Sequence, residues 1–545
     1  MLEKIRARNY KAFDDASVPI KPITILLGAN SVGKSSIIQL LLLLQQTAKE
    51  NYQTYKSALK IFGGTVNLGD EKNLFRKHET KNPLKISFSI INEDFGRYLT
   101  SLRNNFVESF LDLIRYIPLK GFATLRYTKP TDISNIEQFK DFINVFTKTV
   151  TEDYAANTYL DNINYIFSRH GFHISKDDSK DIDKLIRIYS LLEKISKSVL
   201  IGREFDFYFK LAYKKNRLVV ENCRIEHEQK FLAYDGQKNV TNYEKKVLIG
   251  FRKNISNPNE KHIFSDHIKF SDNESEELLK YFQESNALFD CFTKNHENNN
   301  VSTITFYMAN ILIEALKYLR KEFTETSINY VSPLRAHPKR YYMLDKAKTN
   351  ITLDTFDGDD VADVLKNNAI VTNNVNKWLG NFNLKINVEE FKEVVHHLRV
   401  KQNNLNLDIS DVGFGISQVL PVIIQGFLSQ NNSITIIEQP EIHLHPKMQA
   451  DLADLFIDIV KSKGKKKLII ETHSEYILKR LRRRISEGVI DPDDVSICLF
   501  HPQNQIDSAK IESLPIEKKG WFKYPIDFYG EELEKDVTEF LKNQQ

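Results

Sequence analysis

Near the start of the chain lies the stretch that decides its fold, Gly28-Ala29-Asn30-Ser31-Val32-Gly33-Lys34-Ser35, which fits the pattern G-x-x-x-x-G-K-[ST]. An apolar run at residues 23–27 precedes this stretch, and residues 36–41 read as the opening of a helix. In a strand–loop–helix unit of this kind, backbone N–H groups turn inward around an anion, and the helix N-terminus adds about half a positive charge. The stretch therefore predicts a loop that binds phosphate groups.

The residue types of this loop also predict its contacts. Lys34 is long enough to reach the β- and γ-phosphates of a nucleotide, and the Ser35 hydroxyl can ligate Mg²⁺. We therefore expect a nucleotide-binding protein. Its candidate cofactor-binding residues in this region are Asn30, Ser31, Gly33, Lys34, Ser35 and Ser36.

Composition narrows the class of protein. The chain has 545 residues, a length that corresponds to roughly three to four domain equivalents. Of these residues 41% are hydrophobic, which is enough for a sizeable buried core. The formal net charge of +4 is too slight to indicate a nucleic-acid binder, so any basic surface must be local. The apolar run from Leu40 to Leu44 is far too short to cross a bilayer. The three cysteines (Cys223, Cys291 and Cys498) have no metal-like spacing, so we expect a reduced, cytoplasmic chain without a membrane partner.

The pattern of elements predicts an ATPase-like core that is split by a large insertion. Residues 1–90 read as two or three strands, the loop, a helix over 34–48 and a further strand over 84–90. From residue 91 the sequence pattern changes to short amphipathic segments, and residues 91–327 are predicted to form an inserted domain of helices and hairpins. Features of a nucleotide site return over 328–500, and 501–545 form a C-terminal tail segment with a helix from Glu531 to Lys542.

Within the insertion, amphipathic periodicity predicts several elements. We expect helices at 98–116, 181–197 and 303–323, and an aromatic hairpin from 205–211 to 218–220. An Asn-rich patch near 295–300 reads as weakly structured. No heptad pattern persists over several heptads, so a long coiled-coil arm is not expected.

A second constellation lies far along the chain. Residues 433–438 form an apolar strand that ends in Glu438, where a carboxylate would meet Mg²⁺ at the carboxyl end of a sheet. The string Glu438-Gln439-Pro440-Glu441-Ile442-His443-Leu444-His445-Pro446 follows, and a third strand at 468–471 has His473 just past its end. Upstream, residues 409–418 form a glycine-rich turn that opens a helix.

This order of parts resembles the ABC-type ATPase heads of the SMC, double-strand-break-repair and OLD-nuclease groups. The string at 438–446 is similar to the OLD-like branch, and its finer likeness is to the Septu and retron-associated ATPases of bacterial anti-phage defence. Residues 332–335, Ser-Pro-Leu-Arg, and 520–525, Gly-Trp-Phe-Lys-Tyr-Pro, also look like that subgroup. The resemblance covers roughly 1–90 and 328–530. It implies an α/β fold: an ABC-type (SMC/OLD-like) P-loop ATPase head split by a large mixed α+β insertion.

The resemblance also implies the roles of individual residues. ATP and Mg²⁺ would be the cofactors, and two heads would sandwich two ATP molecules. Lys34 and Ser35 would hold phosphate and Mg²⁺, Glu438 would stand at the Walker B position as a Mg²⁺ ligand, and His473 would be the switch histidine at the γ-phosphate. The signature turn, Gly413, Gly415, Ser417 and Gln418, would approach the nucleotide of the partner head.

One departure from the family pattern concerns catalysis. The residue after the Walker B carboxylate is normally a glutamate that orients the attacking water, and here it is Gln439. An amide can hold a water molecule but cannot accept its proton. Either hydrolysis is slow or Glu441 substitutes, so whether ATP is turned over stays open. The role of Arg335 is open as well: its charge could neutralise phosphate, or it could form a structural ion pair.

Other charged residues have two interpretations each. His443 and His445 are only two residues apart, and no further His or Cys lies near them at the spacing of metal ligands. We therefore expect them to pack in a turn or to contact a partner head rather than to hold a metal. The basic runs at 463–467 and 479–484 are either solvated surface or a sequence-independent contact to a phosphate backbone.

Four functions compete at this stage. The favoured one is an ATP-binding regulatory or scaffold ATPase of an anti-phage complex, which gates a separate HNH-type nuclease and leaves a retron reverse transcriptase and its nucleic acid open as further partners. The alternative is an SMC-like head for DNA repair or DNA binding, although that class usually carries a long coiled coil. A self-contained OLD-type nuclease lacks room for a Toprim domain after His473. A transporter subunit lacks any sign of a membrane partner.

Overall fold

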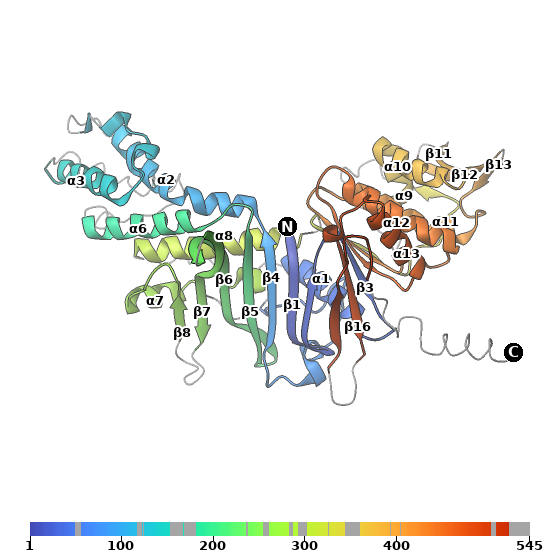
Figure 1. Cartoon of the computed structure of the whole chain (residues 1–545), viewed down its shortest axis with the longest axis horizontal. Helices are drawn as coiled ribbons and strands as arrows, with labels where there is room; N and C mark the ends of the chain where they lie inside the picture. The colour runs from blue at the N-terminus through green and yellow to red at the C-terminus, as the bar shows by residue number, and fades with distance from the viewer. Residues whose placement is uncertain are drawn as a thin grey trace.

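The computed structural model describes residues 1–49, 56–116, 122–123, 125–152, 167, 181–235, 238–253, 261–282, 287–292, 302–324, 326–343, 360–392, 394–403, 405–502 and 508–522. Within these residues the strands form three sheets. Figure 1 shows the helices that follow residue 91 at one end of the molecule and α9–α13 at the other, with the N-terminal strands between them.

The sheet that carries the phosphate loop is six-stranded and mostly parallel, in the order β17-β16-β3-β15-β14-β9. Its strands are β3 (Ile23–Leu27), β9 (Ile328–Val331), β14 (Ile434–Glu438), β15 (Lys467–Glu471), β16 (Val495–His501) and β17 (Lys510–Leu514), the last of which is antiparallel to β16. β3 pairs with β15 and β16, although more than 400 residues separate them in the sequence. The sheet therefore joins the two ends of the chain around the loop.

Both faces of this sheet are buried, as is usual for parallel strands. On one face, Leu26, Ile436 and Ile469 share a core with helix α1 (Lys34–Ala48). On the other, Ile25, Ile437 and Ile470 pack in a second core with α11 (Phe414–Leu428), α12 (Pro446–Lys461) and α13 (Glu475–Ser486). This alternation explains why the strands are apolar runs without a polar face.

The second sheet is antiparallel and seven-stranded among the described residues, in the order β2-β1-β4-β5-β6-β7-β8. Its strands are β1 (Leu2–Tyr10), β2 (Phe13–Pro19), β4 (Leu84–Ile91), β5 (Glu204–Lys214), β6 (Arg217–Asp235), β7 (Lys238–Lys253) and β8 (Lys261–Phe264). β4 pairs with both β1 and β5. The hairpins after residue 91 thus extend a sheet that begins with the N-terminal strands.

Helices lie at the same end of the molecule as this sheet in Figure 1: α2 (Glu93–Tyr116) and α3 (Ile136–Glu152), which both pack on α6 (Ile182–Ser198), together with α7 (Asp272–Leu279) and α8 (Thr303–Lys321). Aromatic rings fill the space between the helices. Phe139 stacks on Tyr189 with centroids 4.2 Å apart, and Phe110 meets Phe146 edge to face at 5.1 Å. Such contacts add to the stabilisation from burial, so these four rings belong to the interior of the region, whereas Tyr127 is 89% exposed.

The third sheet is small and precedes the signature turn. It comprises β10 (Tyr342–Met343), β11 (Leu384–Lys392), β12 (Val395–Gln402) and β13 (Leu405–Asp408), and it packs with α9 (Asp360–Asn367) and α10 (Ala369–Gly380). Short 3₁₀ turns lie at Glu71–Leu74, Arg76–His78, Leu125–Tyr127, Pro130–Asp132, Leu288–Asp290 and Pro492–Asp494.

Most elements expected from sequence periodicity are present. The helix at 34–48 and the N-terminal strands are confirmed, as are the helices near 98–116, 181–197 and 303–323, with ends that differ by a few residues. The aromatic hairpin is longer than expected, because β6 continues to Asp235 and pairs with β7. The Asn-rich patch at 295–300 and the tail helix at 531–542 lie outside the described residues. Among the described helices, none combines the length and the apolar character that a membrane crossing requires.

Candidate functional site

The phosphate loop adopts a conformation that its glycines make accessible. β3 ends at Leu27, and φ is positive at Gly28 (139°), Ser31 (63°) and Gly33 (104°) before α1 begins at Lys34. A Cβ on Gly33 would lie 2.5 Å from the Phe13 ring, and one on Gly28 would lie 2.6 Å from the carbonyl oxygen of Phe500. The loop is therefore pressed against the protein at both glycines.

Lys34 lies across this loop. Its side chain is 3% exposed, and Nζ donates hydrogen bonds to the carbonyl oxygens of Gly28 (2.9 Å) and Ala29 (2.7 Å). Burial lowers the pKa of Lys34, while the neighbouring Glu471 carboxylate acts in the opposite direction. No side chain caps the N-terminus of α1. A helix N-terminus whose N-cap is a glycine, together with a buried ammonium group, fits an anion such as the phosphate chain of ATP. Asn30, Ser31 and Ser35 are exposed, and Ser36 is half-buried at the start of α1.

Two glutamates end neighbouring strands beside the loop. Glu438 ends β14 and Glu471 ends β15, directly opposite each other in register. Ser35 Oγ donates to Glu471 Oε2 over 3.3 Å, and Lys34 Nζ lies 3.8 Å from Glu471 Oε1. Glu438 Oε1 instead accepts a hydrogen bond from the Tyr330 hydroxyl of β9 over 2.8 Å. A serine hydroxyl and two carboxylates are the oxygen ligands that Mg²⁺ prefers, so the residues fit this ion.

Burial shapes the charges of both glutamates. It raises the pKa of Glu438 to about 6, with the Tyr330 hydroxyl opposing the shift and the charge of Glu471 adding to it. Burial also raises the pKa of Glu471, opposed by Lys34 and Ser35. From the sequence alone we expect a strand at 468–471 and assign no role to its last residue, Glu471, or to Tyr330. The available signal was that Glu471 also ends an apolar strand.

The segment after β14 is held to the end of β15. Gln439 has a left-handed backbone, with φ of 45°, and its N–H donates to the carbonyl oxygen of Glu471 over 2.7 Å. Glu441 Oε1 accepts from the N–H of His473 over 2.7 Å. Burial raises the pKa of Glu441, and the hydrogen bond from His473 opposes this. His473 is exposed, and partial burial and the charge of Lys34 lower its pKa.

His443 and His445 do not gather further ligands. His443 is exposed with φ of 63°, and His445 is the N-cap of α12, where Nδ1 accepts from the N–H of Lys447 over 3.3 Å. Across the described ranges, no three His, Cys, Asp or Glu side chains come together as metal ligands. His445 therefore has a structural explanation as a helix cap.

Arg335 is a buried structural donor. Its guanidinium is directed at main-chain carbonyls, with Nη2 donating to Glu438 (2.7 Å) and Gln439 (3.2 Å) and Nη1 to Gln418 (3.3 Å). Burial lowers the pKa of Arg335 to about 10, and the charge of Glu441 opposes this. The side chain ties the signature helix α11 to the segment after β14, rather than reaching into the phosphate loop.

The signature turn packs against the same segment. Gly415, in the first turn of α11, approaches the backbone so closely that a Cβ would lie 2.8 Å from the carbonyl oxygen of His443. Ser417 and Gln418 are buried within their own head, and Gln418 Nε2 donates to the carbonyl oxygen of Ala336 over 3.4 Å. Gly413, the N-cap of α11, is exposed. Of the turn residues, Gly413 is therefore the one that the described structure presents to solvent.

Most of the cations in the two basic runs contact other groups of the protein, whereas Lys463 and Lys465 are exposed. Lys466 and Lys467 are buried and donate to backbone carbonyls, Lys466 to Phe427 (2.8 Å) and Lys467 to Leu2 and Ile20 (2.9 Å each). On α13, Arg480 and Arg484 both pair with Asp454 of α12. The remaining α13 cations are also placed against protein groups: Lys479 pairs with Glu475, Arg483 with Glu487, and Arg482 lies over the Phe522 ring. The expectation of a solvated surface is therefore wrong for Lys466 and Lys467, and the α13 cations lie at the surface in contact with other protein groups.

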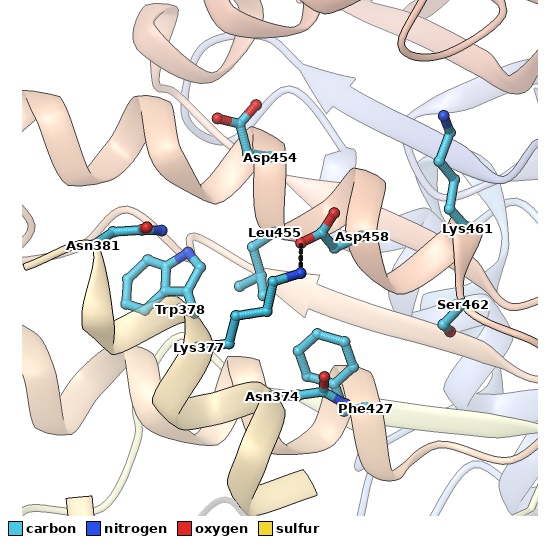
Figure 2. Close-up of a pocket in the computed structure, with 10 residues that line it drawn as sticks. All are labelled: Asn374, Lys377, Trp378, Asn381, Phe427, Asp454, Leu455, Asp458, Lys461 and Ser462. Carbon is cyan, nitrogen blue, oxygen red and sulfur yellow. Dashed lines mark ion pairs between the residues drawn. The ribbon is translucent and has the colours of Figure 1, made fainter. Parts of the chain in front are cut away.

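A separate cavity of about 270 Å³ lies between α10, the end of α11 and α12 (Figure 2). Its walls include the Trp378 indole and Phe427, and Lys377 pairs with Asp458 at 3.7 Å across it. None of its lining residues belongs to the phosphate loop or to the ends of β14 and β15. It is therefore distinct from the candidate nucleotide site.

A family model described as an AAA ATPase domain matches residues 1–478. The chain belongs to the AAA ATPase domain family. The family match and the mostly parallel sheet that carries the phosphate loop together show an α/β P-loop ATPase, in agreement with the expected fold class. Membership of this family implies nucleotide binding, usually with Mg²⁺.

Solved SMC heads are also similar to this AAA ATPase chain, although distantly. An Smc head bound to the C-winged-helix domain of ScpA shares 10% identity over 95% of this chain and 98% of that chain, with a TM-score of 0.38. The SMC head domain from Thermotoga maritima shares 7% identity over 95% and 99%, with a TM-score of 0.33. A Pyrococcus furiosus Smc head with an extended coiled coil, bound to the C-terminal domain of ScpA, shares 10% identity over 100% and 99%, with a TM-score of 0.32. No curated protein matches the chain.

Proposed function

We propose that the chain is an ATP-binding regulatory ATPase whose heads dimerise around ATP and Mg²⁺ and gate a separate nuclease in an anti-phage defence complex. The observation that carries the ATP-binding part is the cluster at the carboxyl edge of the parallel sheet. There the loop lysine and serine meet Glu471, and Glu438 ends the neighbouring strand directly opposite Glu471. Ligands of α/β sheets bind at this edge.

The residues of the cluster have separable tasks. Lys34 would exchange its two carbonyl acceptors for phosphate oxygens, and the first turn of α1 would supply N–H donors. Ser35 and the glutamates would hold Mg²⁺, which neutralises phosphate charge when bound. His473 lies just past the end of β15 and would contact the outermost phosphate as the switch histidine.

Hydrolysis is expected to be slow. Gln439 occupies the place of the usual base and can orient water without taking its proton. Glu441 is the other candidate base, but one of its oxygens accepts a hydrogen bond from the backbone N–H of His473, so the side chain holds the segment after β15. ATP then acts mainly as a ligand that stabilises one conformational state.

The dimer part of the proposal concerns the signature turn. Arg335 links α11 to the backbone of Glu438 and Gln439, so a partner that touches the start of α11 can influence the water-orienting residue. Gly413 would make the first contact with the nucleotide of the partner head. Ser417 and Gln418 would support Gly413 from within their own head, because both side chains are buried there.

The defence role rests on the resemblance of residues 438–446 to the Septu and retron-associated ATPases. A reverse transcriptase with its DNA is a further candidate partner. An SMC-like DNA-repair head is the alternative. The pairing of the α13 cations with acidic residues argues against a DNA-backbone contact on that helix.

The test uses the purified full chain with Mg²⁺ or Mn²⁺ and with supercoiled and single-stranded DNA, with and without ATP. We expect no cleavage by the chain alone. Native mass spectrometry of the complex isolated from cells should show a nuclease subunit. Robust cleavage that disappears in an active-site variant of this chain would contradict the proposal and favour a self-contained nuclease. Isolation with cohesin-like or repair partners would favour the DNA-repair alternative.

A further inference from the structure

We propose that Glu471, rather than Glu438, is the principal carboxylate that holds Ser35 and Mg²⁺ beside the phosphate loop. This inference rests on the proposed ATP-binding function and refines it. The usual expectation places this task on the carboxylate that ends β14. The structure instead brings the end of β15 to the loop.

The first argument is strand order. β15 pairs directly with β3, the strand that enters the loop, and Glu471 lies opposite Leu26 in register. β14 lies on the far side of β15. Because neighbouring strands are about 4.8 Å apart, Glu438 starts about one strand spacing further from the loop than Glu471.

The second argument is the contacts of the two carboxylates. Glu471 is 5% exposed, and its two oxygens face Ser35 Oγ at 3.3 Å and Lys34 Nζ at 3.8 Å. Glu438 Oε1 is held by Tyr330 Oη at 2.8 Å. Tyr330 belongs to β9, which pairs with β14 on the side away from β15. One glutamate is thus directed to the loop, and the other is anchored from the opposite side.

A merely structural role for Glu471, as an anchor for Lys34, makes a different prediction. If Glu471 only positioned Lys34, its replacement would weaken nucleotide binding whether or not a metal is present. If it holds the metal, its replacement would weaken metal binding only. Without a metal, removing a buried negative charge that faces the phosphates would leave nucleotide affinity unchanged or higher.

The experiment measures Mn²⁺ binding by electron paramagnetic resonance, in the presence of the non-hydrolysable β,γ-imido analogue of ATP. The proteins are the wild-type chain, Glu471→Gln and Glu438→Gln. We expect Glu471→Gln to weaken Mn²⁺ affinity by about 10-fold or more, as replacing groups that position a metal commonly does. Glu438→Gln should cause a clearly smaller loss. Calorimetry without metal should show that Glu471→Gln binds the analogue at least as tightly as the wild type.

Two further variants control for folding. Asp206→Asn removes a charge from a carboxylate that is equally buried and also faces a serine and a lysine, but in the antiparallel sheet. It should leave Mn²⁺ affinity unchanged. Ser35→Ala, at an exposed position, should reproduce the loss of Glu471→Gln, and it replaces that variant in the comparison if Glu471→Gln does not fold.

The outcomes separate the two levels of the proposal. A wild-type chain that binds neither the analogue nor Mn²⁺ contradicts the ATP-binding function itself. If the wild type binds both, a loss in Glu438→Gln that equals or exceeds the loss in Glu471→Gln overturns the inference alone. An unchanged Mn²⁺ affinity in Glu471→Gln, or a weaker metal-free affinity for the analogue, overturns it as well.

Discussion

Two buried carboxylates in this molecule have the same kinds of neighbour and different surroundings. Asp206, on β5 of the antiparallel sheet, is 4% exposed and hydrogen-bonds with the Ser89 hydroxyl and the Lys245 ammonium. Glu471, at the edge of the parallel sheet, is 5% exposed and faces Ser35 at 3.3 Å and Lys34 at 3.8 Å. The first carboxylate is fully engaged by its protein partners. The second has a lysine beyond hydrogen-bonding distance.

The difference teaches how scaffold and site can be told apart. In the antiparallel sheet, charged groups find their partners within the protein, as Glu221 does with Lys210 and Lys214. At the edge of the parallel sheet, Lys34 donates its hydrogen bonds to two carbonyl oxygens of the phosphate loop, and its ammonium group lies 3.8 Å from the Glu471 carboxylate. An arrangement of this kind costs little to rearrange when an anion and a cation bind together. Variants at the edge should therefore change ligand binding, and variants in the antiparallel sheet should change stability.

The largest effect is expected from Gln439→Glu. A carboxylate at this position can accept the proton of the attacking water. General-base catalysis of this kind typically increases the rate by about 100-fold or more. Steady-state phosphate release is the measurement. The assignment of Gln439 as the cause of slow hydrolysis would be contradicted by two results together. These are a wild-type turnover of about 10 s⁻¹, the typical enzyme median, and an unchanged rate in Glu441→Gln.

Lys34→Ala should lower ATP affinity about tenfold or more, corresponding to about 1.5–3 kcal/mol for a charge-assisted contact. Calorimetric titration with ATP and Mg²⁺ measures the loss. The matched variant is Lys245→Ala, which removes the lysine next to Asp206. It should lower the free energy of unfolding and leave ATP affinity unchanged. Equal ATP affinities in Lys34→Ala and the wild type would show that the loop is not a phosphate site.

The antiparallel sheet should show its own pH dependence. His227 Nε2 and His267 Nε2 lie 2.9 Å apart, and burial together with the proximity of His227 lowers the pKa of His267 to about 4. The unfolded chain takes up a proton near pH 6.5, and the folded chain does so only near pH 4. Stability is therefore retained above pH 6.5 and falls as the pH decreases towards 4, with a slope of about 1 kcal/mol per pH unit.

Denaturant unfolding from pH 7.5 to 4.5 measures this slope for the wild type and for His267→Gln. The variant should show a shallower dependence than the wild type, with ATP affinity at pH 7.5 unchanged. Parallel pH profiles for the two proteins would show that this histidine pair does not contribute.

The smallest effect is expected from the basic helix α13. Arg480 and Arg484 pair with Asp454, so Arg480→Gln with Arg484→Gln removes surface ion pairs worth at most about 1 kcal/mol each. Any DNA binding, measured by fluorescence anisotropy at several salt concentrations, should keep its affinity and its salt slope. A shallower slope in the variant would assign this helix to a phosphate-backbone contact.

Local patterns predicted the parts of this molecule that depend on neighbours in sequence. The phosphate loop, the strand that ends in Glu438 and the amphipathic helices all follow from residue type and periodicity. The role of Glu471 was not predictable in the same way, because it depends on β15 pairing with β3, which lies more than 400 residues away in the chain.

The charged runs show the same limit. Lys466 and Lys467 belong to a run that reads as solvated surface. Lys467 is buried at the start of β15, where Nζ donates to the backbone of Leu2 and Ile20, and Lys466 is buried with Nζ donating to the end of α11. His445 was expected to pack in a turn or meet a partner head, and the structure uses it to cap α12. The division at residue 91 stays a prediction. The continuous antiparallel sheet shows that strands on both sides of it share one layer.

The central claim, that ATP joins two heads, is tested most directly by sedimentation velocity of the full chain with Mg²⁺, with and without the β,γ-imido analogue of ATP. The account predicts a monomer of 63.4 kDa without nucleotide and a species of twice that mass with it. Lys34→Ala should remain monomeric under both conditions. A wild-type chain that binds the analogue with unchanged mass, at concentrations well above its affinity for the analogue, would contradict the claim.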